Sequence, residues 1–102
     1  MNNSIESIKI SNDEDTVIVF PQKNLIGDVS LSLCQIFDDL ISSGNLNFKL
    51  DFSKVNKIDS IGIGAIVLLN RKTFQKGKVS LEKMNSKIKK FFSLILTEKS
   101  NT

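Results

Sequence analysis

The sequence predicts one α/β domain, in which a mixed, mostly parallel sheet of about four strands is covered by about three helices. Short runs rich in β-branched and aromatic residues alternate with longer segments of helical periodicity, in the order β-β-α-β-α-β-α. The 102 residues suffice for one hydrophobic core, and no repeat, linker or low-complexity stretch divides them. We therefore expect residues 1–102 to form a single domain.

The first two strands are expected to pair as a hairpin. Residues Ile5–Ile10 contain an alternation of apolar and polar side chains, and Thr16–Phe20 (TVIVF) is a run typical of a buried strand that ends at Pro21. The polar residues 12–15 (NDED) between them predict a turn.

A first helix is predicted from an N-cap at Asp28 to a stop at Gly44. Its apolar residues recur at helical spacing: Val29, Leu33, Ile36, Phe37 and Leu40. Cys34 lies near this apolar face, so we expect a small core side chain there and not a nucleophile.

In the second half, Phe48–Phe52 and Val79–Leu81 are predicted as strands, and Ile61–Gln75 as a helix that ends near Gly77. A third helix follows, with either Asn85 or Ser86 as its cap. Its apolar face is expected to contain Ile88, Phe91, Phe92 and Ile95, and the last residues (TEKSNT) are expected to be frayed.

The composition excludes several classes of function. The chain has no histidine and a single cysteine, so a Ser-His-Asp or Cys-His site, an internal disulfide and a cysteine-based zinc site are all excluded within it. We therefore expect neither an enzyme nor a cofactor. A reducing, cytoplasmic setting fits this cysteine usage.

The charge and hydropathy patterns argue against nucleic acid and membrane as direct partners. The net charge is only +3, and the basic residues do not form a stripe. The densest basic cluster is predicted to be a solvated face; it consists of Lys83, Lys87, Lys89 and Lys90. The N-terminus is not a signal peptide, and no apolar run reaches the roughly 20 residues of a spanning helix.

The segment KIDSIGIGAIVLLN (residues 57–70) places an acid and a hydroxyl, Asp59 and Ser60, directly before a hydrophobic helix. One interpretation is capping: either side chain could accept a backbone N–H, and Gly62 and Gly64 would let the helix pack closely. The other is a phosphorylation site, because a phosphate is well tolerated at a helix N-terminus. No third glycine and no P-loop lysine support a nucleotide site.

The helix that follows is apolar almost all round, which predicts two buried or bound faces. Ile63, Ile66, Val67 and Phe74 share the face that we expect against the sheet. The opposite stripe suggests a docking surface for another protein, unless the third helix of the same domain covers it. The partner-binding candidates there are Ile61, Gly64, Ala65, Leu68 and Lys72.

The stretch from Leu50 to Leu69, LDFSKVNKIDSIGIGAIVLL, resembles the STAS family, and within it the bacterial anti-sigma factor antagonists. It combines a Leu-Asp-Phe-Ser strand end, a Val-x-x-Ile-Asp-Ser turn, a Gly-x-Gly pair and a hydrophobic helix start. The order of elements is similar over nearly the whole chain.

The resemblance implies that Ser60 is phosphorylated by an anti-sigma factor with serine kinase activity, supported by Asp59 and Gly62. The unphosphorylated form would bind that kinase and free a sigma factor, and phosphorylation would weaken binding. A phosphatase would be a further partner. The alternative is a constitutive STAS docking subunit of a signalling or transporter assembly, in which Asp59 and Ser60 are caps only.

This sequence departs from the family pattern at two places near the site. Many relatives have a second serine where this chain has Ile61, so Ser60 is the only hydroxyl in the motif. Many also carry an acid in the loop before the first helix, where Leu25 or Ile26 stands here and Asp28 follows slightly later.

Overall fold

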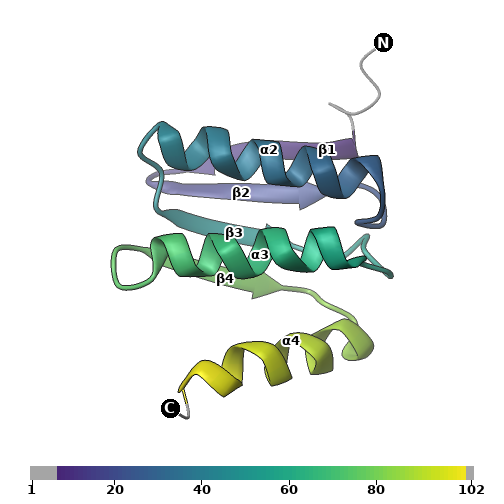
Figure 1. The fold of residues 1–102 in the computed structure, drawn as a ribbon. Coiled ribbons are helices and arrows are strands. Elements are labelled where there is room, and N and C mark those ends of the chain that lie inside the picture. The colour runs from purple at the N-terminus through teal and green to yellow at the C-terminus, as the bar shows by residue number, and fades with distance from the viewer. Residues whose placement is uncertain (1–6, 101–102) are drawn as a thin grey trace.

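The computed structural model describes the backbone of residues 7–100 and the side chains of residues 7–94, and within them the predicted order of elements is confirmed. Figure 1 shows three helices gathered beside a four-stranded sheet. The elements are β1 (Ile8–Asp13), β2 (Thr16–Pro21), α2 (Asp28–Ser42), β3 (Asn47–Asp51), α3 (Ser60–Thr73), β4 (Lys78–Glu82) and α4 (Ser86–Ser100).

The sheet is mixed and mostly parallel, as predicted. Its strand order is β1-β2-β3-β4; β1 pairs antiparallel with β2, and the other two pairings are parallel. In Figure 1, α2 lies across β1 and β2, α3 lies across β3 and β4, and α4 lies beyond the β4 edge. This topology brings the start of α2 and the start of α3 to the same end of the sheet.

The core lies between the helices and one face of the sheet. Val17 and Val19 on β2 and Phe48 and Leu50 on β3 are buried, whereas their strand neighbours are partly exposed. This alternation follows from the two-residue repeat of a strand that is covered on one face. The ring of Phe37 on α2 packs edge-on against Phe48, with 6.1 Å between the centroids.

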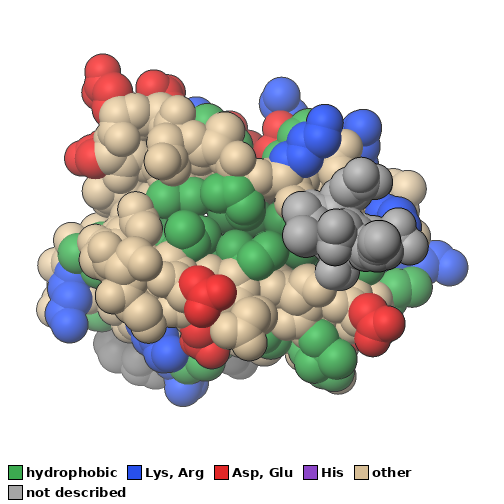
Figure 2. Space-filling model, turned by 90° about the horizontal axis from the view of Figure 1, so that it is seen from above, with side chains coloured by type: hydrophobic (Ala, Val, Ile, Leu, Met, Phe, Trp, Pro, Cys, Tyr) green, Lys and Arg blue, Asp and Glu red, His purple; other side chains and the backbone are tan. Residues whose placement is uncertain are grey.

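The first strand differs from the prediction. It extends to Asp13, so the turn narrows to Glu14 and Asp15; residues 5 and 6 of the predicted strand lie outside the described residues. Ile10 was expected to alternate with Lys9, as Ile8 does; Ile8 is buried, but Ile10 on the same face of the strand is 41% exposed. Seen from above, hydrophobic side chains gather in a hollow between α2 and β1 (Figure 2).

The predicted boundaries of α2 hold to within a residue or two. The N-cap is Gly27 and not Asp28, which is the first helical residue. Gly44 follows the helix as predicted, and its backbone N–H donates to the carbonyl of Ile41.

Helix α3 ends at Thr73, so the prediction that Phe74 packs against the sheet is wrong. Phe74 occupies the C-cap position, where the backbone turns extended, and 59% of its surface is exposed. Ile66 and Leu69 are the large buried residues of the helix, and Ile63 and Val67 are partly buried.

Helix α4 is capped by Asn85, whose side-chain oxygen accepts the N–H of Ile88 at 2.9 Å. Ile88 and Phe92 are buried, and the Phe92 ring lies 6.3 Å from that of Phe52. Phe91, predicted on the same face, is 41% exposed. The helix continues to Ser100, beyond the point where fraying was expected; the side chain of Ile95 and residues 101–102 lie outside the described residues.

Within residues 7–100, no helix combines the length and the apolar character that crossing a membrane requires.

Candidate functional site

The turn between β3 and α3 places Asp59 and Ser60 at the start of α3. Asp59 is the N-cap, and its Oδ1 accepts the backbone N–H of Gly62 at 2.9 Å. Ser60 is the first helical residue and is exposed. Of the two predicted capping residues, Asp59 and Ser60, it is therefore Asp59 that caps the helix. The Ser60 hydroxyl has no hydrogen-bond partner within the described part of the chain.

The same carboxylate also holds the start of α2. Asp59 Oδ1 accepts the hydroxyl of Ser30 at 2.7 Å, and Oδ2 accepts the backbone N–H of Gly27 at 2.8 Å. We call these bonds, together with the bond from Gly62, the Asp59 clamp. One side chain thus satisfies backbone donors at the N-termini of two helices, which have no partners within their own helices.

Backbone pairing reinforces the Asp59 clamp. The N–H of Asp59 donates to the carbonyl of Leu25 at 2.9 Å, and the N–H of Leu25 donates to the carbonyl of Lys57 at 3.0 Å. The side-chain oxygen of Asn24 accepts the N–H groups of Asn56 and Lys57 at 2.7 and 3.1 Å. The loops before α2 and α3 are therefore held together, so the backbone around Ser60 is fixed from both sides.

The electrostatics of the clamp favour a charged Asp59. Hydrogen bonds from the Gly62 N–H, the Ser30 hydroxyl and the Gly27 N–H hold the pKa of this carboxyl below its usual value of 3.8. The carboxylate is consequently ionised at neutral pH, next in sequence to the Ser60 hydroxyl.

The two glycines of α3 differ in their surroundings. A Cβ at Gly62 would lie 2.9 Å from Cγ1 of Ile58 and 3.0 Å from the Ser30 hydroxyl, so Gly62 permits the close packing that was predicted. A Cβ at Gly64 would meet no atom within 4 Å, so the prediction of close packing at Gly64 is wrong.

Two residues of the stripe predicted as a docking surface are exposed to solvent. Ile61 has 42% and Leu68 has 47% of its surface exposed. The third apolar member of the stripe, Ala65, is only 7% exposed and lies against α2, in a small crevice that Cys34 and Phe37 also line. Ala65 is therefore not available to a partner, and that part of the prediction is wrong. Gly64 is exposed.

Lys72, the last residue of the predicted stripe, pairs with α2. Its Nζ lies 3.6 Å from Oδ1 of Asp38, and both side chains are about half exposed. An ion pair of this kind contributes little and is easily exchanged for another acidic group. Lys72 therefore remains accessible to a partner.

Sequence reasoning missed the members of the clamp that lie on α2. Gly27 and Ser30 are 32 and 29 residues from Asp59, and no periodic pattern reports a contact over such a separation. It also missed Ile26 and Leu31, two exposed apolar residues at the start of α2. Asp28 is exposed in the first turn of α2 and is not part of the clamp.

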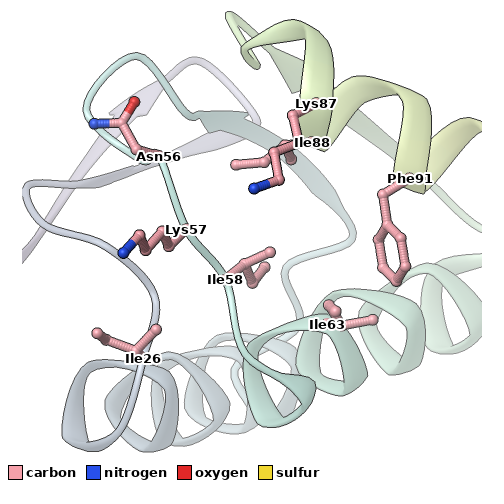
Figure 3. A pocket seen from close by; sticks show the side chains of 8 residues that line it. All are labelled: Ile26, Asn56, Lys57, Ile58, Ile63, Lys87, Ile88 and Phe91. Atoms are coloured by element: carbon pink, nitrogen blue, oxygen red, sulfur yellow. The ribbon is translucent and has the colours of Figure 1, made fainter.

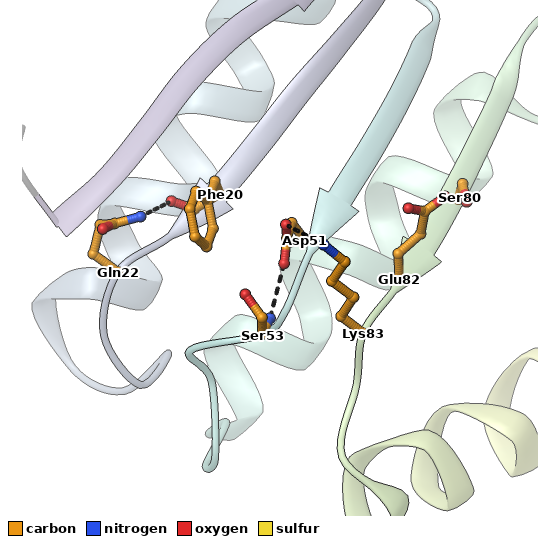
Figure 4. A network of polar contacts seen from close by, with 7 residues as sticks. All are labelled: Phe20, Gln22, Asp51, Ser53, Ser80, Glu82 and Lys83. Carbon is orange, nitrogen blue, oxygen red and sulfur yellow. Dashed lines mark hydrogen bonds and ion pairs between the residues drawn. The ribbon is translucent and has the colours of Figure 1, made fainter.

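A second group of polar contacts lies at the carboxyl ends of the strands (Figure 4). Asp51 Oδ1 accepts the N–H of Ser53 at 2.9 Å where β3 ends, and Lys83 Nζ lies 3.8 Å from the other oxygen of Asp51. Ser80 donates to Glu82 at 3.0 Å. These contacts order the strand ends. Among the side chains of residues 7–94, no group of three or more His, Cys, Asp or Glu could hold a metal ion.

The sequence matches no protein-family model and no curated protein. Among solved structures, the chain is similar to the crystal structure of a proposed anti-sigma factor antagonist from Thermotoga maritima (TM-score 0.80, 24% identity, 97% of this chain and 86% of that one). An NMR structure of the Thermotoga protein TM1081 gives a TM-score of 0.71 at 27% identity, over 88% of this chain and 74% of that one.

The chain is also similar to the anti-sigma factor antagonist SpoIIAA in its unphosphorylated form, with a TM-score of 0.76 and 17% identity over 84% of this chain and 81% of that one. At 24% and 17% identity, the likeness to these two antagonists establishes a shared fold, a mixed sheet with helices on one face. The chain has the fold of the STAS domain, the domain to which these antagonists belong.

Proposed function

We propose that this protein is a cytoplasmic anti-sigma factor antagonist, a binding protein and not an enzyme, whose affinity for its partner is controlled by phosphorylation of Ser60. The observation that carries the proposal is the exposed Ser60 at the first position of α3, directly after a carboxylate that fixes the surrounding backbone. The unphosphorylated form would bind an anti-sigma factor with serine kinase activity and so release the sigma factor. A phosphatase would reverse the modification.

The physical basis of the switch is the charge that phosphate adds beside an apolar surface. A phosphoserine carries about −1.5 to −2 charges. The start of a helix tolerates this charge, so the fold would survive the modification. Ile61 is exposed directly beside Ser60, and burying a phosphate against such a surface in a complex is costly. Phosphorylation would therefore weaken docking without unfolding the domain.

The first experiment tests the site. Incubation with the anti-sigma kinase encoded nearest to this gene and ATP should add one phosphate, measured by intact mass. Ser60→Ala should abolish it. Ser86→Ala is the matched control, because Ser86 is also an exposed serine at the first position of a helix. Modification that persists in Ser60→Ala, or that is lost in Ser86→Ala, would contradict the assignment.

The second experiment tests the docking surface. Leu68→Glu should weaken the complex strongly, because Leu68 is an exposed apolar residue of α3 whose replacement leaves the core intact. Phe74→Glu is the control, since Phe74 is also exposed but lies beyond the far end of the helix. Calorimetric titration with the anti-sigma factor would measure both. Equal binding by wild type and Leu68→Glu would place the interface elsewhere.

A second candidate function follows from the Asp59 clamp itself. All three bonds of the clamp join groups of the protein itself, as expected if Asp59 serves only the fold of a constitutive docking subunit. Ser60→Asp separates the two functions. The switch requires that this variant bind the partner more weakly than wild type, whereas a constitutive subunit would bind equally in both forms.

A further inference from the structure

A pocket lies between α4 and the segment that leads into α3 (Figure 3). Its volume is about 440 Å³. Pockets for small molecules typically measure about 300–1,000 Å³ and are mostly apolar with a few polar groups. The residues proposed to bind the anti-sigma factor do not line it, so it is a separate feature of the surface.

The walls of the pocket are apolar and come from four segments of the chain. Ile26 lies before α2, Ile58 before α3 and Ile63 on α3, while Ile88 and Phe91 come from α4. Phe91 is exposed although it belongs to the apolar face of α4, because it turns toward this pocket (Figure 3). A ligand with a hydrocarbon body would cover these side chains.

The polar groups of the pocket are cationic or neutral. Lys57 comes from the segment before α3, Lys87 comes from the first turn of α4, and Asn56 adds an amide; no acidic residue lines the pocket. Within the described residues, neither lysine forms an ion pair or a side-chain hydrogen bond. Two ammonium groups without a counter-charge beside an apolar surface complement an anion attached to a hydrocarbon chain.

We propose that this pocket binds a small amphipathic carboxylate of the fatty-acid type, with the hydrocarbon chain between α4 and α3 and the carboxylate beside Lys87, whose side chain points into the pocket (Figure 3). Lys57, which extends from the other side of the segment before α3, adds a second positive charge to the lining. The bound molecule would contact Ile58, which precedes Asp59 and packs against the position of Gly62. It would therefore lie next to the Asp59 clamp. The binding itself does not require phosphorylation of Ser60.

Decanoate at a concentration below micelle formation is the probe, titrated into the full chain and followed by calorimetry and by NMR. We expect saturable one-site binding with shifts at Ile63, Ile88 and Phe91, and weak or no binding of decylammonium. Lys57→Gln/Lys87→Gln should weaken decanoate binding by about fivefold to tenfold, as expected for the loss of two exposed charge pairs. Lys9→Gln/Lys76→Gln, with the same charge change outside the pocket, should bind like wild type.

Three results would overturn the proposal: no saturable binding of decanoate, equal binding of decylammonium, or equal weakening by both pairs of lysine substitutions. Ser60→Ala separates this proposal from the switch, because it should bind decanoate like wild type while losing phosphorylation. If the protein binds decanoate but is never phosphorylated, the proposal for the pocket stands and only the proposed phosphorylation switch is contradicted.

Discussion

At the scale of single residues, Asp59 has more partners than its position as an N-cap requires. Its two oxygens accept bonds from Gly62 on its own helix and from Gly27 and Ser30 at the start of α2. A phosphate on Ser60 would be added next to this bound carboxylate. Both oxygens of Asp59 already accept hydrogen bonds from Gly27, Ser30 and Gly62. We therefore assign Asp59 the role of holding the backbone at Ser60 in position.

Asp59→Ala should lower the midpoint of chemical denaturation more than any other substitution of an acidic residue near the site. The variant loses three hydrogen bonds and leaves the N–H groups of Gly27 and Gly62 without their acceptor. Asp28→Ala is the control, because Asp28 lies in the first turn of α2 but takes no part in the clamp. If both variants unfold at the same urea concentration, the clamp does not stabilise the fold.

The stability of the wild type should also fall in acid with a contribution from Asp59. Its folded pKa is lowered, so the contribution is complete above the usual value of 3.8 and is lost as the pH falls through the folded value. Urea midpoints measured between pH 6 and pH 2 should fall less steeply in Asp59→Asn.

Asp51 should also make the fold less stable in acid. Burial opposes the ionisation of its carboxyl, but hydrogen bonds from Ser53 and the charge of Lys83 lower its pKa overall. An unchanged slope in Asp59→Asn would assign the acid sensitivity to such other groups.

At the scale of elements, local patterns predicted the type and order of the strands and helices from β1 to α4, because periodicity and capping act within a few residues. They did not predict which side of α3 meets α2. Ala65 lies on the apolar stripe with Ile61 and Leu68, yet it alone is buried there, since the packing of α2 beside α3 decides this and no local pattern encodes it. The Asp59 clamp was missed for the same reason.

Gly62→Ala and Gly64→Ala should change stability in opposite directions. At Gly62 the new methyl group would collide with Ile58 and Ser30, and such overpacking costs about 1–3 kcal/mol. At Gly64 there is open space, so alanine should stabilise the helix by about 0.5–1 kcal/mol. Urea denaturation of both variants measures the difference; a stabilised Gly62→Ala would show that α3 is not tightly seated on Ile58.

At the scale of the whole molecule, α4 is attached differently from α2 and α3. Helices α2 and α3 pack against each other across the sheet, whereas α4 lies beyond β4 and buries Ile88 and Phe92. The phenylalanine pair of Phe52 and Phe92 thus fixes the outermost helix of the described chain, and with it one wall of the pocket described above.

Phe92→Ala should destabilise the domain by about 3 kcal/mol or more, the usual cost of truncating a buried phenylalanine. Its neighbour Phe91 provides a matched control, because 41% of Phe91 is exposed whereas 1% of Phe92 is. Phe91→Ala should cost about 1 kcal/mol or less, mainly through its edge contact with the Phe92 ring. Thermal and urea denaturation would both show the contrast, and equal losses would contradict the described packing of α4.

Helix α4 should also open before the rest of the domain. An amide exchanges through the opening of lowest free energy that exposes it, and an element at the edge of a fold tends to open before the centre of the core. Helix α4 lies at such an edge, beyond β4. Amides near Ile88 and Phe92 should therefore exchange faster than those near Ile66 and Leu69, which lie at the centre of the core. Phe92→Ala should speed exchange in α4 further while the order of protection among β2, β3 and α3 is kept. If the amides of α4 and β3 share one protection value in native-state exchange, the domain opens as a single unit, and α4 cannot move independently of the Asp59 clamp.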